Sequence, residues 1–132
     1  MQVFISYASP DREFARELAS RLSEAGFEVL DPEHDVSGGE NIPLKIGRAL
    51  EQSDAMIVLL SPEAVRTPSL RREIDYALGS PNFEQRLISV LMRPTEDIPW
   101  ILRKLPMVAA GKDLARVSNR IIQQLQQHAK AE

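Results

Sequence analysis

Short apolar segments alternate with segments of helical periodicity along this chain. The apolar segments are rich in aliphatic and β-branched residues and span residues 2–6, 27–30, 54–60, 86–92 and 106–109. Between most of them, apolar residues recur at the spacing that marks one face of an α-helix. Strands that are separated by helices pair in parallel through right-handed crossovers. The pattern therefore predicts an α/β fold with a five-stranded, doubly wound parallel sheet.

Four segments carry a helical stripe of apolar residues. The first spans residues 11–25, and we expect Ser9 to cap its start, Pro10 to take the first helical position and Gly26 to end it. The stripe residues, in order, are Phe14, Leu18 and Leu22; Ile42, Ile46, Ala49 and Leu50; Leu70, Ile74, Ala77 and Leu78; and Leu114, Val117, Ile121 and Leu125. The third helix is expected to end near Gly79, and the last to turn its glutamines (residues 123, 124, 126 and 127) outward.

Two of the apolar segments, residues 55–60 and 87–92, have no polar face. Strands of this kind are typical of the centre of a parallel sheet, where helices cover both faces. Residues 93–106 contain three prolines and predict a loop with at most a short helix. Trp100 in this loop is expected to pack over the core, with stacking on a base or on a partner as the alternative.

Composition excludes several classes of function. The 132 residues include 16 basic and 19 acidic side chains, for a net charge of −3, and no basic run with aromatics suggests a nucleic-acid surface. Cysteine is absent from the sequence, which excludes disulfides and thiol nucleophiles. The longest apolar run, residues 55–60, is too short to insert into a membrane, and the start lacks the layout of a secretion signal. We expect one cytoplasmic domain over residues 1–132, either complete or the N-terminal part of a longer protein.

Familiar ligand motifs of α/β sheets are missing from the sequence. No G-x-G-x-x-G follows the first strand, and no G-x-x-x-x-G-K-[ST] phosphate loop is present. The two histidines, His34 and His128, lack the spacing of metal ligands. A response-regulator receiver needs clustered acids after the first strand and an aspartate ending the third, but these places hold Ser6-Tyr7 and Leu60-Ser61. We therefore expect no metal and no receiver chemistry.

Polar residues follow the first predicted strand directly. Ser6, Tyr7 and Ser9 stand where this strand meets a helix, and open α/β sheets hold ligands in the crevice beyond the carboxyl ends of their strands. The segment 69–74 brings the carboxylate of Glu73 toward the same rim. From spacing alone, the simpler interpretation of Glu73 is a helix glutamate paired with a neighbouring arginine.

Six short motifs occur in the order in which Toll/interleukin-1 receptor (TIR) domains carry them. They are Phe4-Ile5-Ser6-Tyr7, Gly26-Phe27-Glu28-Val29-Leu30-Asp31, Gly38-Gly39-Glu40-Asn41-Ile42, Ser53-Asp54-Ala55, Leu60-Ser61-Pro62 and Arg71-Arg72-Glu73-Ile74. A single motif of this kind is weak evidence, whereas the ordered set over nearly the whole chain is specific. The sequence therefore resembles the TIR family, and its bacterial members in particular.

The resemblance implies a flavodoxin-like sheet and an enzymatic activity. Many bacterial TIR domains cleave NAD⁺ between nicotinamide and ribose, and in that family the helix after the third strand supplies a glutamate that maps onto Glu73. NAD⁺ is then a substrate, and no cofactor is implied. By their place in the family's motifs, the residues expected to hold it are Tyr7, Ala8, Asp31, Asn41 and Ser69.

Some positions depart from the pattern of many active relatives. Ser69 stands where they carry tryptophan, and Ala8 and Ser9 stand where arginines often follow the Ser-Tyr motif. A helix cap remains the simpler interpretation of Ser9, and a plain turn suits Asp31 equally well. Two functions stay open. One is an NAD⁺ glycohydrolase or cyclase activated by self-assembly, as in bacterial defence; the other is a non-catalytic module that binds other TIR domains through residues 31–41.

Overall fold

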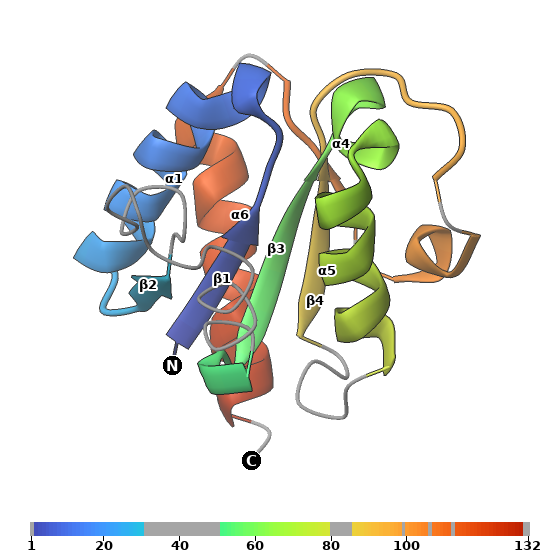
Figure 1. Cartoon of the computed structure of the whole chain (residues 1–132). Coiled ribbons are helices and arrows are strands. Elements are labelled where there is room, and N and C mark those ends of the chain that lie inside the picture. The colour runs from blue at the N-terminus through green and yellow to red at the C-terminus, as the bar shows by residue number, and fades with distance from the viewer. Residues whose placement is uncertain are drawn as a thin grey trace, which may run out of the picture.

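Five parallel strands form the central sheet. They are β1 (Gln2–Ser6), β2 (Glu28–Leu30), β3 (Ala55–Leu60), β4 (Leu87–Leu91) and β5 (Met107–Ala109), in the order β2-β1-β3-β4-β5 (Figure 1). The computed structural model describes residues 2–30, 51–79, 86–98, 100–105, 107–111 and 113–130, with all side chains except those of Ser69, Ile101 and residues 127–130. The predicted fold class and all five predicted strands are confirmed.

Helices cover both faces of this sheet (Figure 1). α1 (Arg12–Glu24) and α6 (Leu114–Lys130) lie on one face, and α4 (Pro62–Arg66) and α5 (Pro68–Gly79) lie on the other. The described elements also include two 3₁₀ turns, η1 (Ser9–Asp11) and η3 (Trp100–Lys104). The doubly wound arrangement follows the alternation in the sequence. The predicted helix with the stripe Ile42 to Leu50 lies outside the described residues.

The alternation of side chains along the strands divides the core into two layers. In the layer under α1 and α6, Ile57 packs with Leu18 and Ile121. In the layer under α5, Met56 packs with Ile74. All six residues of β3 are buried, as the absence of a polar face predicts. The sheet therefore has a helix layer on each face, and the fully buried strand β3 lies at the centre of the sheet.

The start of the first helix differs from the prediction. The N-cap positions of η1 and α1 are Ala8 and Asp11, and neither is capped by a side chain, so Ser9 is not the cap. Ala8 is extended, with φ −92° and ψ 159°, and its carbonyl accepts a 2.9 Å hydrogen bond from the amide of Asp11. The turn is therefore closed by backbone atoms before α1 begins. Gly26 does end this helix, with a φ of 97° that favours glycine.

Trp100 is also placed differently from the prediction. The short helix expected between residues 93 and 106 is present as η3, but Trp100 is 69% exposed rather than packed over the core. The tight repeat of a 3₁₀ turn points Trp100 and Leu102 in different directions, and the fully buried Leu102 occupies the core position. In α6, Gln124 is half-buried instead of turned fully outward.

Within the described ranges, α4 is a short helix that we did not predict. Ser61 caps α4, since its Oγ accepts a 3.1 Å hydrogen bond from the amide of Ala64, and Pro62 takes the first helical position. Serine followed by proline is a recognisable start signal for a helix, so the sequence did contain the information. None of the helices in the described ranges combines the length and the apolar character needed to cross a membrane.

Truncation of the central strand should be costly. Leu59 of β3 is fully buried, so Leu59→Ala should lower the free energy of unfolding by about 2–5 kcal/mol through lost burial and the cavity left behind. Leu114→Ala, at the half-buried first residue of α6, is the matched control and should cost clearly less. Urea denaturation measures both, and equal losses would contradict the layered core.

Candidate functional site

The strand order places a switch point between β1 and β3. The chain passes from β1 to β2 on one side of β1 and returns to β3 on the other side. In sheets of this order, ligands bind beyond the carboxyl ends of the strands, in the crevice where the two chain directions part. Tyr7 and Ala8 leave β1 at this point, and Ser61 leaves β3. The switch point therefore lies at the place where the sequence predicts a ligand crevice.

The turn after β1 packs directly on the α4–α5 region. Ala8 is buried in a small cluster with Ala64 of α4 and Leu70 of α5. Ser69 precedes Leu70 in the first turn of α5, so its backbone lies beside this cluster, while its side chain is outside the described set. The structure thus brings together three predicted parts of the site: the β1–α1 turn, the start of α5 and, one turn further along, Glu73.

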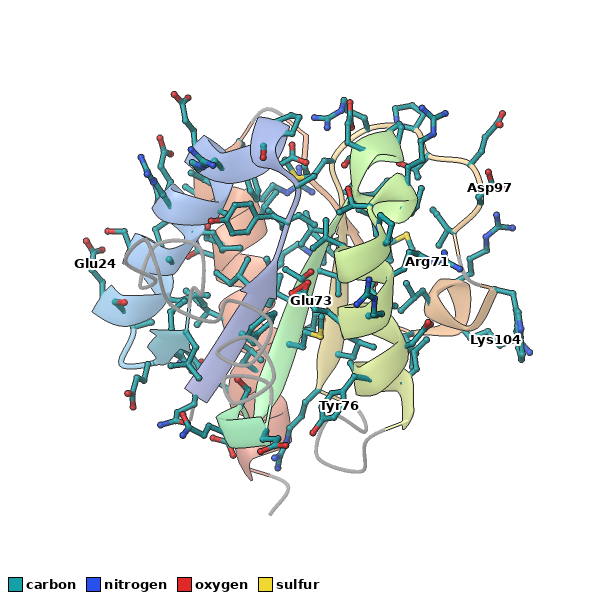
Figure 2. All side chains as sticks on the ribbon, in the orientation of Figure 1. Glu24, Arg71, Glu73, Tyr76, Asp97 and Lys104 are labelled. Atoms are coloured by element: carbon teal, nitrogen blue, oxygen red, sulfur yellow. The ribbon has the colours of Figure 1, made fainter. Side chains whose placement is uncertain are left out.

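Glu73 is a buried carboxylate. Its residue is 8% exposed, although it lies on a helix whose outer side is exposed at Arg72, Asp75 and Tyr76. Figure 2 shows the Glu73 side chain extending from α5 over the strands, on the side of the helix away from Arg71. Its neighbour Ile74 is fully buried in the core layer under α5. The carboxylate therefore faces the molecule and not the bulk solvent.

The interpretation of Glu73 as one half of a pair with a neighbouring arginine stays a prediction, and the two nearest arginines in the sequence lie in different surroundings. The guanidinium of Arg71 donates a 3.4 Å hydrogen bond to the backbone carbonyl of Asp97. The side chain of Arg72 is exposed on the outer side of α5. Burial of a carboxylate has a free-energy cost that a surface glutamate does not have. A buried glutamate such as Glu73 therefore indicates a structural or functional role.

A row of buried hydroxyl groups runs across the same face of the sheet. Ser6 of β1 is paired in register with Val58 of β3, and Val58 with Ser89 of β4. Ser6 and Ser89 are 2% and 0% exposed, and neither Oγ has a hydrogen-bond partner among the described residues. Leaving such a group unpaired costs about 1–3 kcal/mol. We did not predict Ser89; its signal was a single polar residue inside the apolar run 87–92.

The remaining predicted site residues are not gathered around Glu73 by the described structure. Tyr7 is buried in the layer under α1 and α6, on the opposite face of the sheet from Glu73. A ligand that contacts both side chains must therefore pass over the carboxyl end of β1. Ser9 is exposed, and Asp31 and Asn41 lie outside the described residues. For these residues the binding role stays a prediction.

Three turns at the carboxyl edge of the sheet are tied together by one arginine. Arg93, which follows β4, donates to both carboxylate oxygens of Asp11 at 2.9 and 3.3 Å and to Glu63 of α4 at 2.9 Å. The side chain of Asp11 is only 2% exposed, whereas that of Arg93 is 40% exposed. We call Arg93, Asp11 and Glu63 the arginine clamp. It links the β1–α1 turn to α4 and to the loop after β4.

Titration properties follow from these contacts. The hydrogen bonds to Asp11 and then to Glu63 raise the pKa of Arg93 above its already high ordinary value. The pKa of Glu63 lies below its ordinary value of 4.5, first because its own backbone amide donates to the carboxylate and then because Arg93 does. Arg93 and Glu63 are thus both charged over the whole neutral range.

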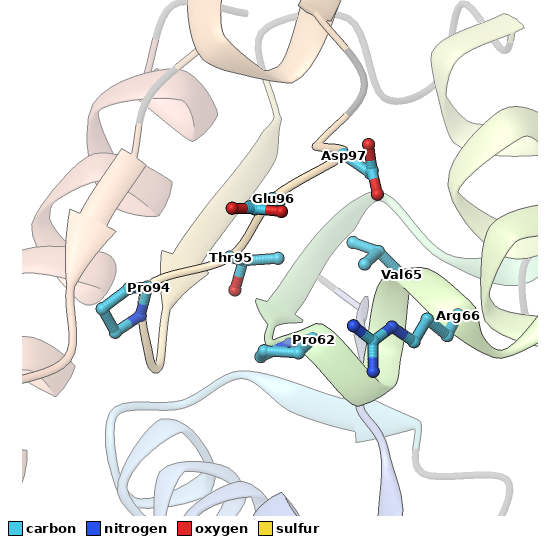
Figure 3. Close-up of a pocket in the computed structure, with 7 residues that line it drawn as sticks. All are labelled: Pro62, Val65, Arg66, Pro94, Thr95, Glu96 and Asp97. Atoms are coloured by element: carbon cyan, nitrogen blue, oxygen red, sulfur yellow. The ribbon is translucent and has the colours of Figure 1, made fainter.

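A cleft of about 360 Å³ lies next to the clamp (Figure 3). Pro62, Val65 and Arg66 of α4 form one wall, and residues 94–97 of the loop after β4 form the other. Among the residues that the structure describes, neither Glu73 nor any other predicted site residue lines it. In the described part of the chain, histidine, aspartate and glutamate side chains do not gather in groups that could hold a metal ion. The candidate site therefore remains at Glu73, beneath the β1–α1 turn.

Comparison with known sequences identifies the family of this chain. The sequence model of the TIR domain family matches residues 3–128. A curated protein of Bacteroides thetaiotaomicron, named 2′ cyclic ADP-D-ribose synthase BtTIR, is 38% identical over 64 residues. That alignment covers 48% of this chain and 22% of the relative, so the matched stretch is only about a fifth of that protein.

Solved structures with the same fold include two metazoan proteins. The TIR domain of the Toll-related receptor TRR-2 from Hydra magnipapillata superposes with a TM-score of 0.76 at 26% identity, covering 95% of this chain and 97% of that one. A TIR-STING receptor from C. gigas, in complex with 2′,3′-cGAMP, gives a TM-score of 0.78 at 26% identity. In this case 93% of this chain and 38% of the receptor chain are covered.

Breaking the arginine clamp should destabilise the fold. Arg93→Met removes the partner of the buried Asp11 carboxylate and should lower the free energy of unfolding by about 2 kcal/mol. This value is smaller than the cost of breaking a fully buried ion pair, because solvent screens the partly exposed Arg93. Arg93→Lys keeps the charge but not the two-point contact and should fall in between. Arg120→Met on the exposed side of α6 is the control. If Arg93→Met and this control were equally stable in urea denaturation, that result would contradict the clamp.

The contribution of Glu63 should depend on pH. Its folded pKa is depressed, so its stabilising effect is present above about pH 4.5 and is lost as the pH falls through the lower folded value. Glu63→Gln should therefore be slightly less stable than the wild type at neutral pH and equal to it in strong acid. Thermal unfolding over this pH range, with the exposed-residue variant Glu17→Gln as control, measures the difference. A gap that persists in strong acid would refute the assignment.

Proposed function

This chain belongs to the TIR domain family, whose model covers residues 3–128, and we propose that it cleaves NAD⁺ between nicotinamide and ribose. The observation that carries the proposal is the buried Glu73 on the sheet side of α5, next to the switch-point crevice. The name of the Bacteroides thetaiotaomicron relative, a cyclic ADP-ribose synthase, supports an NAD⁺-processing activity at the level of the family.

A lone carboxylate suits this reaction. The nicotinamide ring of NAD⁺ is positively charged, so when the bond between its nitrogen and the ribose C1′ breaks, the electron pair neutralises the ring. The leaving group therefore needs no general acid. Positive charge develops instead on the ribose as an oxocarbenium ion, and a preorganised anion beside the sugar lowers the energy of that transition state. Glu73 is the residue that we assign to this role.

The described surroundings of Glu73 favour such an electrostatic role. Its burial excludes most water, and a charge–charge interaction is stronger in a water-poor site than in bulk solvent. The hydroxyl of Ser6 is buried on the same face of the sheet and has no partner among the described residues. A carboxylate held in place on α5 can orient the sugar as well as stabilise its charge.

The reaction ends when a nucleophile takes the place of nicotinamide at C1′. Water gives linear ADP-ribose, whereas a hydroxyl of the substrate itself gives a cyclic isomer, and in both cases the attacking oxygen loses one proton to the solvent. The proposal covers the bond that is broken and both of these outcomes. We further propose that self-assembly with other TIR domains activates the enzyme and that it serves NAD⁺ depletion or signalling in bacterial defence.

The second candidate function is a non-catalytic module that only assembles with other TIR domains. The observation in its favour is Ser69, which stands where many active relatives carry tryptophan. Without that ring, a stacking surface for the nicotinamide or the adenine is lost. An assay of purified protein with NAD⁺, at low and high protein concentration and with a crowding agent, separates the two functions by the release of free nicotinamide.

Neutralising Glu73 should abolish this release. Glu73→Gln keeps the shape of the side chain and removes the charge that the oxocarbenium ion needs, so we expect at least a ~100-fold loss of turnover, the scale typical of one removed stabilising group. The melting temperature should change little. Nicotinamide is quantified by chromatography under the conditions in which the wild type is active.

Glu17→Gln on the exposed side of α1 is the matched control and should keep full activity. Turnover retained in Glu73→Gln would remove Glu73 from the mechanism. A wild type that releases no nicotinamide under any assembling condition would favour the non-catalytic module.

A further inference from the structure

One aromatic and two basic side chains project together from η3. Trp100 is 69% exposed, and Nζ of Lys104 lies 5.2 Å from the centroid of its ring, which is a cation–π geometry. Arg103 on the same turn is exposed. Neither basic group forms an ion pair within the described part of the chain. We call Trp100, Arg103 and Lys104 the basic–aromatic surface.

This surface is held in place from beneath. Leu102, in the middle of the turn, is fully buried in the core layer under α5, and the amide of Leu105 donates a 3.2 Å hydrogen bond to its carbonyl. Arg71 of α5 donates to the carbonyl of Asp97 just before the turn. Figure 2 shows Arg71, Asp97 and Lys104 on this one side of the molecule. A surface that is already ordered loses little conformational entropy on binding.

A surface of the opposite charge lies at the turn between α1 and β2. We call residues 24–28 the acidic turn. Its two ends, Glu24 and Glu28, are exposed, and between them lie the exposed Ala25 and Gly26 and the half-buried Phe27. The left-handed Gly26 and a 3.0 Å hydrogen bond from the amide of Phe27 to the carbonyl of Leu22 fix its shape. An uncharged strip is thus flanked by two carboxylates.

The two surfaces lie on opposite sides of the molecule. The acidic turn leads into β2, the strand at one edge of the sheet, and η3 precedes β5, the strand at the other edge. Figure 2 shows Glu24 and Lys104 at the two sides. One chain can therefore use both surfaces at the same time, each with a different neighbour.

We propose that the basic–aromatic surface of one copy docks on the acidic turn of a second copy. Trp100 covers the strip at Ala25 and Gly26, while Arg103 and Lys104 face the flanking carboxylates. An exposed tryptophan is the type of residue that anchors protein interfaces, and the charges set the orientation. Because the contact joins two different surfaces, it is heterologous and propagates copies in a row.

The chemistry of both surfaces favours a second copy over another partner. The basic–aromatic surface offers an aromatic ring and two cations. The acidic turn of the same chain offers an uncharged strip and two carboxylates, so the two surfaces are complementary. A row of copies also leaves Glu73 outside the contact, since the carboxylate lies beneath α5 and belongs to neither surface. The contact rests on the self-assembly that the proposed function includes, and it assigns the surfaces that make it.

Charge reversal on each surface, separately and together, tests the contact. One variant carries Arg103→Glu with Lys104→Glu, a second carries Glu24→Lys with Glu28→Lys, and a third carries all four changes. Self-association of the purified chains is measured by sedimentation velocity over a range of concentrations and salt. Each single-surface variant should associate at least ~10-fold more weakly than the wild type. The variant with all four substitutions should regain most of the affinity, because opposite charges again face each other.

Two further variants sharpen the test. Trp100→Ala should weaken association with all charges intact, and Glu17→Lys with Arg120→Glu, two exposed positions outside both surfaces, should leave it unchanged. Far-UV circular dichroism and melting confirm that every variant is folded. High salt should weaken the wild-type contact, since the charges are exposed and screened.

The outcomes separate this contact from the proposed function. If the wild type associates and every variant associates equally well, the chains use another surface. That result overturns the contact but leaves self-assembly intact. A wild type that stays monomeric overturns both the contact and the self-assembly. Neither result bears on Glu73, because nicotinamide release is measured independently with Glu73→Gln.

Discussion

The burial of β3 on both faces is the constraint on which the structure depends. Its six residues offer no polar side to water, so one helix layer has to cover each face. A chain can satisfy this need only by winding in one direction from β1 and then in the other, which creates the switch point between β1 and β3. The switch point at the candidate site thus follows from the need to cover the central strand. The same need places α5, with Glu73 on its inner side, directly over the sheet.

The carboxyl edge of the sheet is ordered by a different interaction. Apolar packing fixes the strands and helices, and at this edge it joins the β1–α1 turn to α4 and α5 through the small cluster of Ala8, Ala64 and Leu70. The arginine clamp joins the turns that leave β1, β3 and β4 through one guanidinium, and Asp11 is buried by it almost completely. Buried charges of this kind add specificity of geometry more than net stability. The clamp therefore helps to fix where the β1–α1 turn lies relative to α4.

The sequence was sufficient for the elements that obey a strong period. All five strands, the buried centre at β3, and the stripes of α1, α5 and α6 followed from the spacing of apolar residues, because one buried face imposes that spacing. It was insufficient where the partner is distant: nothing near Asp11 in the sequence points to Arg93, 82 residues away. The prediction for Trp100 was wrong for a related reason. Its hydrophobicity favoured burial, but Leu102 occupies the core position in this turn. For Glu73, spacing alone favoured a helix glutamate paired with an arginine, and the family motif gave the reason to assign it to the site, whereas its burial is a finding of the structure.

The two faces of α5 connect the proposed chemistry to the proposed contact. On its inner side the helix carries Glu73, and on its outer side Arg71, only two residues earlier, holds the carbonyl of Asp97 at the entrance to η3. A neighbour that docks on Trp100 therefore presses on a segment that is tied to α5 within one helical turn of the carboxylate. Leu102 extends the link, because it lies in the same apolar layer as Ile74, the residue next to Glu73. In a packed interior, displacements are transmitted through such contacts instead of being absorbed. Assembly can in this way act on the carboxylate without covering it, which is the property that an assembly-activated enzyme requires of its interface.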